Sequence, residues 1–332
     1  MVQVFQIDPV EALLPYTDEK VKVGSAGGNL VIGDCSSEAD VLTQAGDSEI
    51  LLVSWKPLVT PHVMDALPKL RLIVRWGVGY DQIDVPAATQ RGIAVANAPT
   101  YGVEEVAEHT IALLFTCARR VAWFHERLRK GEYPSFTLNR IQRIDGQFLG
   151  IIGLGRIGSA VARRARGVGL NILVYDPYLS DSQIRAQGYE ARTLNQILVE
   201  SDIVTVHVPL SDSTVHLLDF PAISRMKKGA ILLNTSRGPI LDELALCAAL
   251  DSGHLAAAGI DVYEHEPLSA TSPLRDLEHI VLTPHMASYS EQSWQALRAE
   301  VCDTVCDWIR HSWASTVVNR EVRDQLRPRG TT

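Results

Sequence analysis

The chain has 332 residues, 46% of them hydrophobic and 21% charged, so it is long enough for two domains and too apolar to be mainly disordered. Its 31 basic and 39 acidic side chains give a formal net charge of −8 at pH 7, which argues against nucleic acid as a partner. No apolar stretch reaches the roughly 20 residues of a membrane span, and residues 1–10 contain no Lys, Arg or apolar core, so we expect a cytoplasmic protein without membrane anchor or secretory signal.

Short β-branched runs alternate with helical patterns along most of the chain, which is typical of βαβ units and parallel sheets. The first strands are expected at Val2–Ile7, Leu30–Ile32, Ile50–Ser54, Leu70–Arg75 and Ile93–Ala96. Helices are expected between them at Thr60–Leu67 and Val85–Arg91.

A long helical pattern begins after a break at residues 97–99 (NAP). Apolar residues recur with the i, i+3, i+4 spacing of one helix face from Val103 onward, so we expect a single helix that runs to about Arg129. The basic, aromatic residues 119–130 at its end are interpreted as an interface or packing helix, with nucleic-acid binding as the alternative.

A second series of strands follows a polar linker at residues 133–146. Its strands are expected at Phe148–Ile152, Ile172–Tyr175, Ile203–His207, Ile231–Thr235, Ala257–Asp261 and Ile280–Thr283. These six strands suit one complete doubly wound sheet. A final helix is predicted at Ser290–Arg310, and because no strand follows it we expect it to pack on the first domain. The expected domains are therefore 1–99 with 288–332, and 100–287.

A glycine-rich turn, GLGRIG at residues 153–158, lies between a predicted strand and a predicted helix. Gly153 would permit the tight turn, Gly155 would let a pyrophosphate approach the backbone, and Gly158 would let helix and strand pack closely. Asp176 ends the next strand, where its carboxylate can accept hydrogen bonds from a ribose and oppose a 2′-phosphate. The alternative is a tight turn with a chance acid. The motif favours NAD as cofactor. Together with the return of the last helix to the first domain, it predicts an α/β fold of two doubly wound parallel sheets, with a Rossmann domain inserted in a discontinuous substrate domain.

Three reactive residues follow strands of the second series, namely Arg237, Glu266 and His285. Reduction of a 2-oxo acid by hydride needs a cation for the carboxylate, a proton donor for the forming alkoxide, and a carboxylate that orients this donor. Each residue taken singly has a simpler interpretation as a turn, a loop acid or a helix-entry cap. His265 has no second nitrogen or sulfur ligand at metal-site spacing, so we expect no metal.

Seven blocks of the chain, in order, resemble the D-isomer-specific 2-hydroxyacid dehydrogenases. They are residues 75–84 (RWGVGYDQID), 97–99 (NAP), 106–108 (VAE), the glycine turn, 234–238 (NTSRG), 261–267 (DVYEHEP) and 283–285 (TPH). Residues 176–181, 289–292 and 318–319 look most like the branch that includes the C-terminal-binding proteins, which are corepressors with bacterial relatives of enzyme type. The resemblance implies a discontinuous, flavodoxin-like substrate domain, a homodimer formed by the NAD domain, and catalysis in the cleft between the domains.

The resemblance also implies roles for individual residues. Arg237 would bind substrate, and Glu266 would pair with His285, the general acid or base. The backbone amides of Val78 and Gly79 would receive the substrate carboxylate, with Arg75 as a second cation. Further implied or expected contacts are Arg156 with pyrophosphate, Thr235 and Asp261 with nicotinamide, and Ile157, His207, Pro209, Thr214 and Ser236 with other parts of the coenzyme. Tyr101 and Ser288 depart from the family pattern and are expected to line the substrate pocket.

The leading hypothesis is therefore an NAD-dependent oxidoreductase that interconverts a 2-oxo acid and its D-2-hydroxy acid. One alternative is an NADH-sensing interaction protein of corepressor type. Another is phosphoglycerate dehydrogenase, which Lys56 and Arg75 keep open because they could meet a phosphate.

Overall fold

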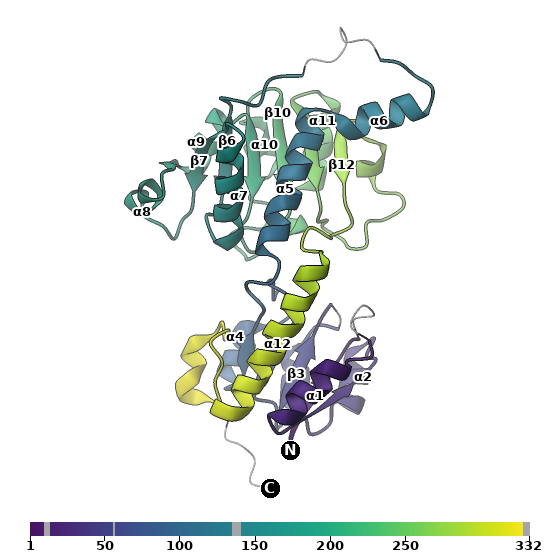
Figure 1. The fold of residues 1–332 in the computed structure, drawn as a ribbon, viewed down its shortest axis with the longest axis vertical. Coiled ribbons are helices and arrows are strands. Elements are labelled where there is room, and N and C mark those ends of the chain that lie inside the picture. Colours follow the sequence, from purple (N-terminus) through teal and green to yellow (C-terminus); the bar gives the residue numbers. More distant parts are fainter. Residues whose placement is uncertain (10–13, 56, 135–140, 328–332) are drawn as a thin grey trace. The chain divides into compact units, whose positions relative to one another are not determined.

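The computed structural model describes residues 1–9, 14–55, 57–134 and 141–327. The chain divides into two compact units (Figure 1). Unit 1 comprises Met1–Gly102 with Ser290–Thr332, and unit 2 comprises Val103–Tyr289. Among the described residues, no helix combines the length and hydropathy of a membrane span.

Unit 1 is built on a five-stranded parallel sheet in the order β2-β1-β3-β4-β5, a flavodoxin-like arrangement. The strands are β1 (Val2–Gln6), β2 (Gly28–Ile32), β3 (Ile50–Val53), β4 (Leu72–Arg75) and β5 (Ala94–Ala96). The helices are α1 (Thr17–Ser25), α2 (Glu38–Gln44), α3 (Pro61–Ala66), α4 (Val85–Gln90) and α12 (Glu291–His311). One face of the sheet packs against α1 and α12 through residues such as Leu297, Val301 and Trp308, and the other packs against α2, α3 and α4.

The helices α1 and α2 are absent from the sequence prediction because their sequences carry little apolar periodicity. In α1 only Glu19 and Val23 are buried, and in α2 only Val41. Burial of Glu19 depends on Arg298 of α12, whose Nη2 donates to the Glu19 Oε2 at 3.0 Å. An ion pair between segments so far apart in sequence leaves no local signal, so α1 depends on the tertiary structure.

Unit 2 is built on a seven-stranded parallel sheet in the order β12-β11-β10-β9-β6-β7-β8. The strands are β6 (Phe148–Ile152), β7 (Asn171–Tyr175), β8 (Glu190–Ala191), β9 (Ile203–Val206), β10 (Ala230–Asn234), β11 (Leu255–Ile260) and β12 (Ile280–Leu282). The two-residue β8 adds an edge strand to the six expected from sequence. This order contains the Rossmann arrangement, so the prediction of two parallel-sheet α/β domains is confirmed.

Helices cover both faces of the second sheet (Figure 1). They are α5 (Val103–Ala118), α6 (Val121–Arg129), α7 (Arg156–Gly167), α8 (Asp181–Ala186), α9 (Leu194–Glu200), α10 (Phe220–Ser224) and α11 (Glu243–Asp251). Short 3₁₀ helices lie at Gly238–Ile240 and Pro273–Asp276. Most α-helices of this unit begin with a side chain that accepts a hydrogen bond from the first turn, as Asp219 does for α10 and Asp242 for α11.

The prediction of one helix from Val103 to about Arg129 is wrong. The helix ends at Ala118, and a second one begins at Val121, because Arg120 adopts the left-handed conformation with φ 51°. A left-handed residue that is not glycine gives no sequence signal for a helix end. The separate helix α6 buries none of its residues.

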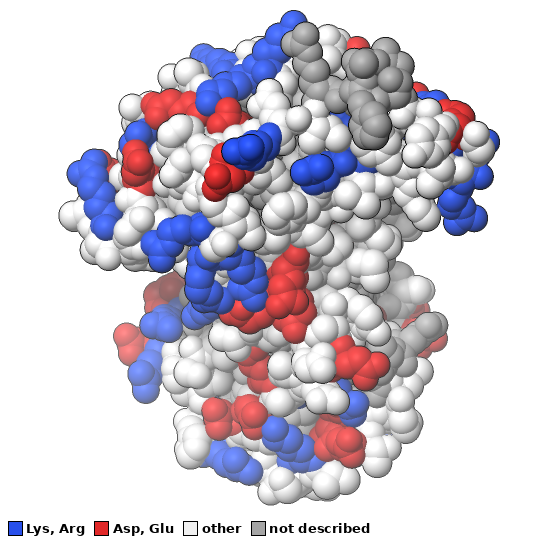
Figure 2. Space-filling view, turned by 45° about the horizontal axis from the view of Figure 1, so that its top comes forward, with Lys and Arg blue, Asp and Glu red and all other residues white. Residues whose placement is uncertain are grey.

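Basic and acidic side chains are interspersed on the face shown in Figure 2. Ion pairs join neighbouring helices of unit 2, as between Arg163 of α7 and Glu104 of α5 at 2.9 Å. All five cysteines are buried and free.

Candidate active site

The glycine turn between β6 and α7 uses its three glycines in different ways. Gly153 has φ +95°, and a Cβ there would lie 2.7 Å from the carbonyl oxygen of His207. A Cβ at Gly158 would overlap the carbonyl of Gly153, whereas one at Gly155 would meet no heavy atom within 4 Å. The backbone is therefore closely packed at Gly153 and Gly158, whereas open space lies beside Gly155 at the N-terminus of α7. This arrangement fits a coenzyme pyrophosphate.

Asp176, after β7, joins the end of its strand to the glycine turn. Its Oδ2 accepts a hydrogen bond from the Leu154 amide at 2.8 Å, and its Oδ1 accepts one from the Tyr178 amide at 2.9 Å. A carboxylate offers about four acceptor positions, so this one retains acceptor capacity for two ribose hydroxyls. Its contact with a ribose stays a prediction.

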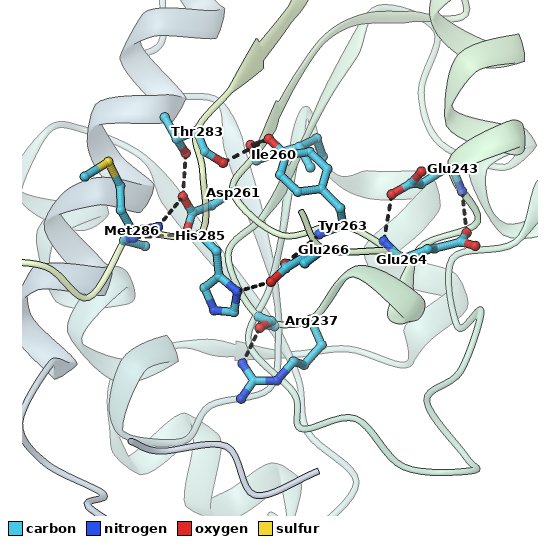
Figure 3. Close-up of polar contacts among 12 residues, drawn as sticks. Arg237, Glu243, Ile260, Asp261, Tyr263, Glu264, Glu266, Thr283, His285 and Met286 are labelled. Carbon is cyan, nitrogen blue, oxygen red and sulfur yellow. Dashed lines mark hydrogen bonds and ion pairs between the residues drawn. The ribbon is translucent and has the colours of Figure 1, made fainter. Parts of the chain in front are cut away.

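Unit 2 brings the side chains of Arg237, Glu266 and His285 together from three different loops (Figure 3). Gly238 explains why the first two loops meet: a Cβ at this position would overlap the backbone of Tyr263. The loop that carries Arg237 and the loop that carries Glu266 therefore pack backbone against backbone. The Arg237 guanidinium also donates to its neighbour's carbonyl, Ser236 O, at 2.7 Å.

Glu266 and His285 form a direct pair, with 2.6 Å between Oε2 of the carboxylate and Nδ1 of the ring. The other oxygen, Oε1, accepts a hydrogen bond from the Tyr263 amide at 3.0 Å. Burial opposes ionisation of Glu266, but the hydrogen bond and charge of His285, followed by the Tyr263 amide and the charge of Arg237, outweigh it. The pKa of Glu266 is therefore lowered, and the group is a carboxylate at neutral pH.

His285 adopts a left-handed backbone conformation, with φ 49°. Such strain in a non-glycine residue costs on the order of 1–3 kcal/mol and persists only where the surroundings impose it. Here Asp261 imposes it: its carbonyl accepts from the His285 amide at 2.8 Å, and its carboxylate accepts from the amides of Met286 at 3.1 Å and Ala287 at 2.9 Å.

The Asp261 carboxylate is buried within unit 2, with its side chain 1% exposed. It also accepts a hydrogen bond from Thr283 Oγ1 at 2.6 Å, and Thr283 Oγ1 lies 3.0 Å from Nε2 of His109 on α5. These contacts give Asp261 a positioning role for the His285 loop, whereas its predicted contact with nicotinamide stays a prediction. His109 and Thr283 were not predicted as site residues, although His109 directly follows the recognised block 106–108 and Thr283 is the first residue of the block 283–285.

Two reciprocal hydrogen bonds between Glu243 and Glu264 connect the Glu266 loop to α11 (Figure 3). The Glu243 amide donates to Oε1 of Glu264 at 3.0 Å, and the Glu264 amide donates to Oε1 of Glu243 at 2.8 Å. Burial and the negative charge of Glu264 raise the pKa of Glu243 above its usual value. The loop at residues 261–267 is thus held to the His285 loop through Asp261 and Glu266 and to α11 through Glu264.

The remaining predicted coenzyme residues line the same carboxyl edge of the second sheet. Thr235 is buried, with its hydroxyl 3.0 Å from that of Thr110, and the Ser236 hydroxyl donates to Val206 O at 2.5 Å. The Thr214 hydroxyl donates to Pro209 O at 2.8 Å. His207 is a half-buried residue, and burial lowers its pKa to about 3, so its ring is neutral at physiological pH. Arg156 and Ile157 form the first turn of α7.

In unit 1, the predicted substrate residues follow β4 and β5. The side chain of Asn97 donates to Val78 O at 2.6 Å and holds the turn in place. Within the described ranges, neither the Val78 amide nor the Gly79 amide donates a hydrogen bond to another residue, so both suit an anionic ligand. Arg75 is only 4% exposed. Tyr101 of this unit and Ser288 of unit 2 are half-buried, and their place in a substrate pocket stays a prediction.

This arrangement offers a cation, an imidazole and an ionised carboxylate beside an edge that fits a dinucleotide. Such groups can bind an anionic carbonyl substrate and transfer one proton. No group of three or more metal-ligating side chains occurs among the described residues.

Comparison with known proteins gives a consistent picture. The model of the D-isomer specific 2-hydroxyacid dehydrogenase NAD-binding domain matches residues 111–287, just over half of the chain. A glyoxylate reductase of Korarchaeum cryptofilum is 40% identical over 304 residues, which cover 90% of this chain and 87% of that enzyme. A D-3-phosphoglycerate dehydrogenase of Methanocaldococcus jannaschii is 35% identical over 96% of this chain, but the match spans only 60% of that longer protein.

Among solved structures, D-lactate dehydrogenase from Aquifex aeolicus, complexed with NAD and lactic acid, aligns with a TM-score of 0.81. The two sequences are 28% identical, and the alignment covers 99% of this chain and 100% of the other. The names of these relatives differ in the substrate that they give.

Proposed function

Because the chain belongs to the D-isomer-specific 2-hydroxyacid dehydrogenase family and is an NAD-dependent oxidoreductase, we propose that it reduces a 2-oxo acid to the D-2-hydroxy acid in the loops around Arg237, Glu266 and His285. The observation that carries the proposal is the 2.6 Å pair between Glu266 and His285 beside a guanidinium, at the edge where the glycine turn lies. Unit 2 supplies the coenzyme site, and a role of Val78 and Gly79 in binding the substrate carboxylate stays a prediction.

The residues of the chain perform the binding and the proton transfer. Arg237 binds the anionic end of the substrate and polarises the carbonyl that is reduced. The His285 imidazolium donates its Nε2 proton to the carbonyl oxygen as that oxygen becomes an alkoxide, while Nδ1–H stays hydrogen-bonded to ionised Glu266. Reduced nicotinamide, when bound, supplies the hydride. In the oxidation direction His285 takes the proton back.

The direct test is NADH consumption with glyoxylate, hydroxypyruvate and phenylpyruvate. We expect turnover with at least one of them, beginning with glyoxylate because the K. cryptofilum relative at 40% identity is a glyoxylate reductase. His285→Gln should abolish turnover and leave NADH binding intact. A protein that binds NADH but reduces none of the three compounds would contradict the proposal.

Two other functions were considered, and the same variant tests the first of them. An NADH-sensing protein of the C-terminal-binding-protein branch would keep its partner binding in His285→Gln, and assignment to that branch stays a prediction. Phosphoglycerate dehydrogenase is less favoured because Arg75 is 4% exposed. Lys56, the other residue considered for a phosphate, lies outside the described residues.

We further propose that the protein is a homodimer through α6 of the NAD-binding unit. This helix buries none of its residues, and it exposes Val121 by 55% and Leu128 by 60%. Light scattering after size-exclusion chromatography should show a dimer, and Leu128→Glu should shift it to a monomer. Leu244→Glu, at a 73% exposed position of α11, is the matched control and should leave the dimer intact. A cytoplasmic location stays a prediction.

A further inference from the structure

The β9 loop, residues 207–218 after strand β9, lies beside the loop of unit 2 that carries Arg237. His216, near the end of the β9 loop, has a left-handed backbone conformation with φ 47°. Its amide donates to Pro239 O at 2.8 Å, two residues after Arg237 in the sequence. Left-handed strain in a residue other than glycine persists only where surrounding contacts impose it, so His216 is held from outside its own loop.

The His216 ring reaches a third loop of the same unit. Its Nε2 lies 3.4 Å from Oε1 of Glu264, and the two side chains are 46% and 27% exposed. Glu264 precedes Glu266 by two residues, in the loop whose backbone packs against Gly238. His216 therefore contacts the Arg237 loop with its backbone and the Glu266 loop with its side chain.

The carboxylates that His216 faces carry negative charge close together. The Glu243 and Glu264 side chains each accept the other's amide, and burial together with the charge of Glu264 raises the pKa of Glu243. An imidazole beside Glu264 Oε1 can donate its Nε2–H in the charged form and in one neutral tautomer, and in the charged form it also offsets the negative charge. This one oxygen thus connects the Glu266 loop both to α11 and to the β9 loop.

The first part of the β9 loop contains residues that are predicted to contact the coenzyme. The Thr214 hydroxyl donates to Pro209 O at 2.8 Å and accepts a hydrogen bond from the Ser211 amide at 2.8 Å. These bonds close residues 209–214 into a compact turn. Because His216 follows Thr214 by only two residues, its contact with Glu264 fixes this turn relative to the Glu266 loop.

We propose that His216 is a positioning residue that fixes the Glu266 loop against the coenzyme-binding part of the β9 loop. The inference rests on the proposed function and adds one residue to it. In this role His216 acts through Glu264 and not on the reacting atoms. It keeps Glu266, and with it the His285 imidazole, in the position relative to the coenzyme that the reaction needs.

The test begins with removal of the ring. In His216→Gly the backbone conformation is retained, because glycine adopts a positive φ without strain. At saturating NADH we expect kcat for glyoxylate to fall about three- to fivefold, since a partly exposed charged contact is worth up to about that factor. The Kd for NADH should stay at the wild-type value. A weaker affinity for NADH with an unchanged kcat would overturn the inference.

Two further variants serve as rescue and control. His216→Gln carries a side-chain amide that can donate to Glu264 Oε1, and it should restore most of kcat. Failure of this rescue would count against the contact with Glu264. Val215→Ala, next to His216 and 49% exposed, is the matched control and should change neither kcat nor the Kd for NADH.

A double-mutant cycle tests whether the effect passes through Glu264. Glu264→Gln keeps an oxygen that can accept the Glu243 amide and removes the charge that faces His216. If His216 acts through Glu264, the variant with both His216→Gly and Glu264→Gln should have the kcat of His216→Gly alone. Additive losses, or a wild-type kcat in His216→Gly, overturn the inference.

Hydrogen exchange separates this inference from the proposed function. In the NADH complex, peptides that span residues 261–267 should exchange faster in His216→Gly than in wild type, and at the wild-type rate in His216→Gln. If the wild type reduces none of the 2-oxo acids, the proposed function fails, and this measurement decides the inference by itself. Equal exchange in all three proteins overturns it.

Discussion

Gly238→Ala tests whether the close approach of two loops sets the geometry of the site. A methyl group at Gly238 would overlap the carbonyl carbon and oxygen of Tyr263 and the Glu264 amide nitrogen. All three are backbone atoms, so no flexible side chain can move aside, and the loops must separate by roughly an ångström. A displacement of that size between groups that act together costs on the order of a hundredfold in rate. Overpacking also destabilises a fold by about 1–3 kcal/mol.

The assay is kcat/KM for glyoxylate reduction together with urea unfolding. We expect Gly238→Ala to lose about a hundredfold in kcat/KM because Arg237 and Glu266 lie on the two loops that separate. Gly167→Ala is the matched control: Gly167 lies in α7, and a Cβ there would meet no heavy atom within 4 Å. That variant should keep full activity and gain up to about 1 kcal/mol in stability. A folded Gly238→Ala protein with wild-type kcat/KM would refute the reasoning.

Four further predictions concern single side chains. Arg237→Ala should lower both substrate affinity and kcat, because one cation serves the ground state and the transition state; steady-state kinetics with unchanged values would remove it from the site. Asp176→Ala should relax the preference for NAD over NADP, and an unaltered ratio of the two kcat/KM values would exclude a ribose contact. His109→Leu should lower kcat more than it raises KM, since it removes a support of Asp261 and Thr283 and not a substrate contact; an unchanged kcat would contradict this role. Glu243→Gln should raise the free energy of unfolding at pH 7 by up to about 1 kcal/mol but leave it unchanged at pH 3. Folding raises the pKa of the Glu243 carboxyl, so the wild-type protein loses stability as the pH rises through that pKa, and the variant does not. Equal gains at both pH values in urea unfolding would argue against this explanation.

Strong local signals account for most of the elements that could be predicted. The buried strands are short apolar runs, and in the glycine turn at residues 153–158 a Cβ is excluded at Gly153 and Gly158, whereas Gly155 leaves open space. Predicted strand ends differ from the observed ones by up to two residues, as at Leu70–Arg75 against Leu72–Arg75. Elements without such signals were missed: α1 depends on a buried Glu19 paired with Arg298, and the end of α5 depends on a left-handed Arg120.

The sequence alone determined the chemistry that is available: a dinucleotide motif, a guanidinium, a carboxylate and an imidazole in the order of one family. These follow from residue types and short spacings, because turns and strands are set largely by interactions between residues that are close together in the chain. Only the tertiary structure decided how the groups are used. Asp261 is enclosed by Thr283 and the His285 loop, and Trp55 covers Arg75, because these contacts join segments that are distant along the chain and meet only when the sheets assemble.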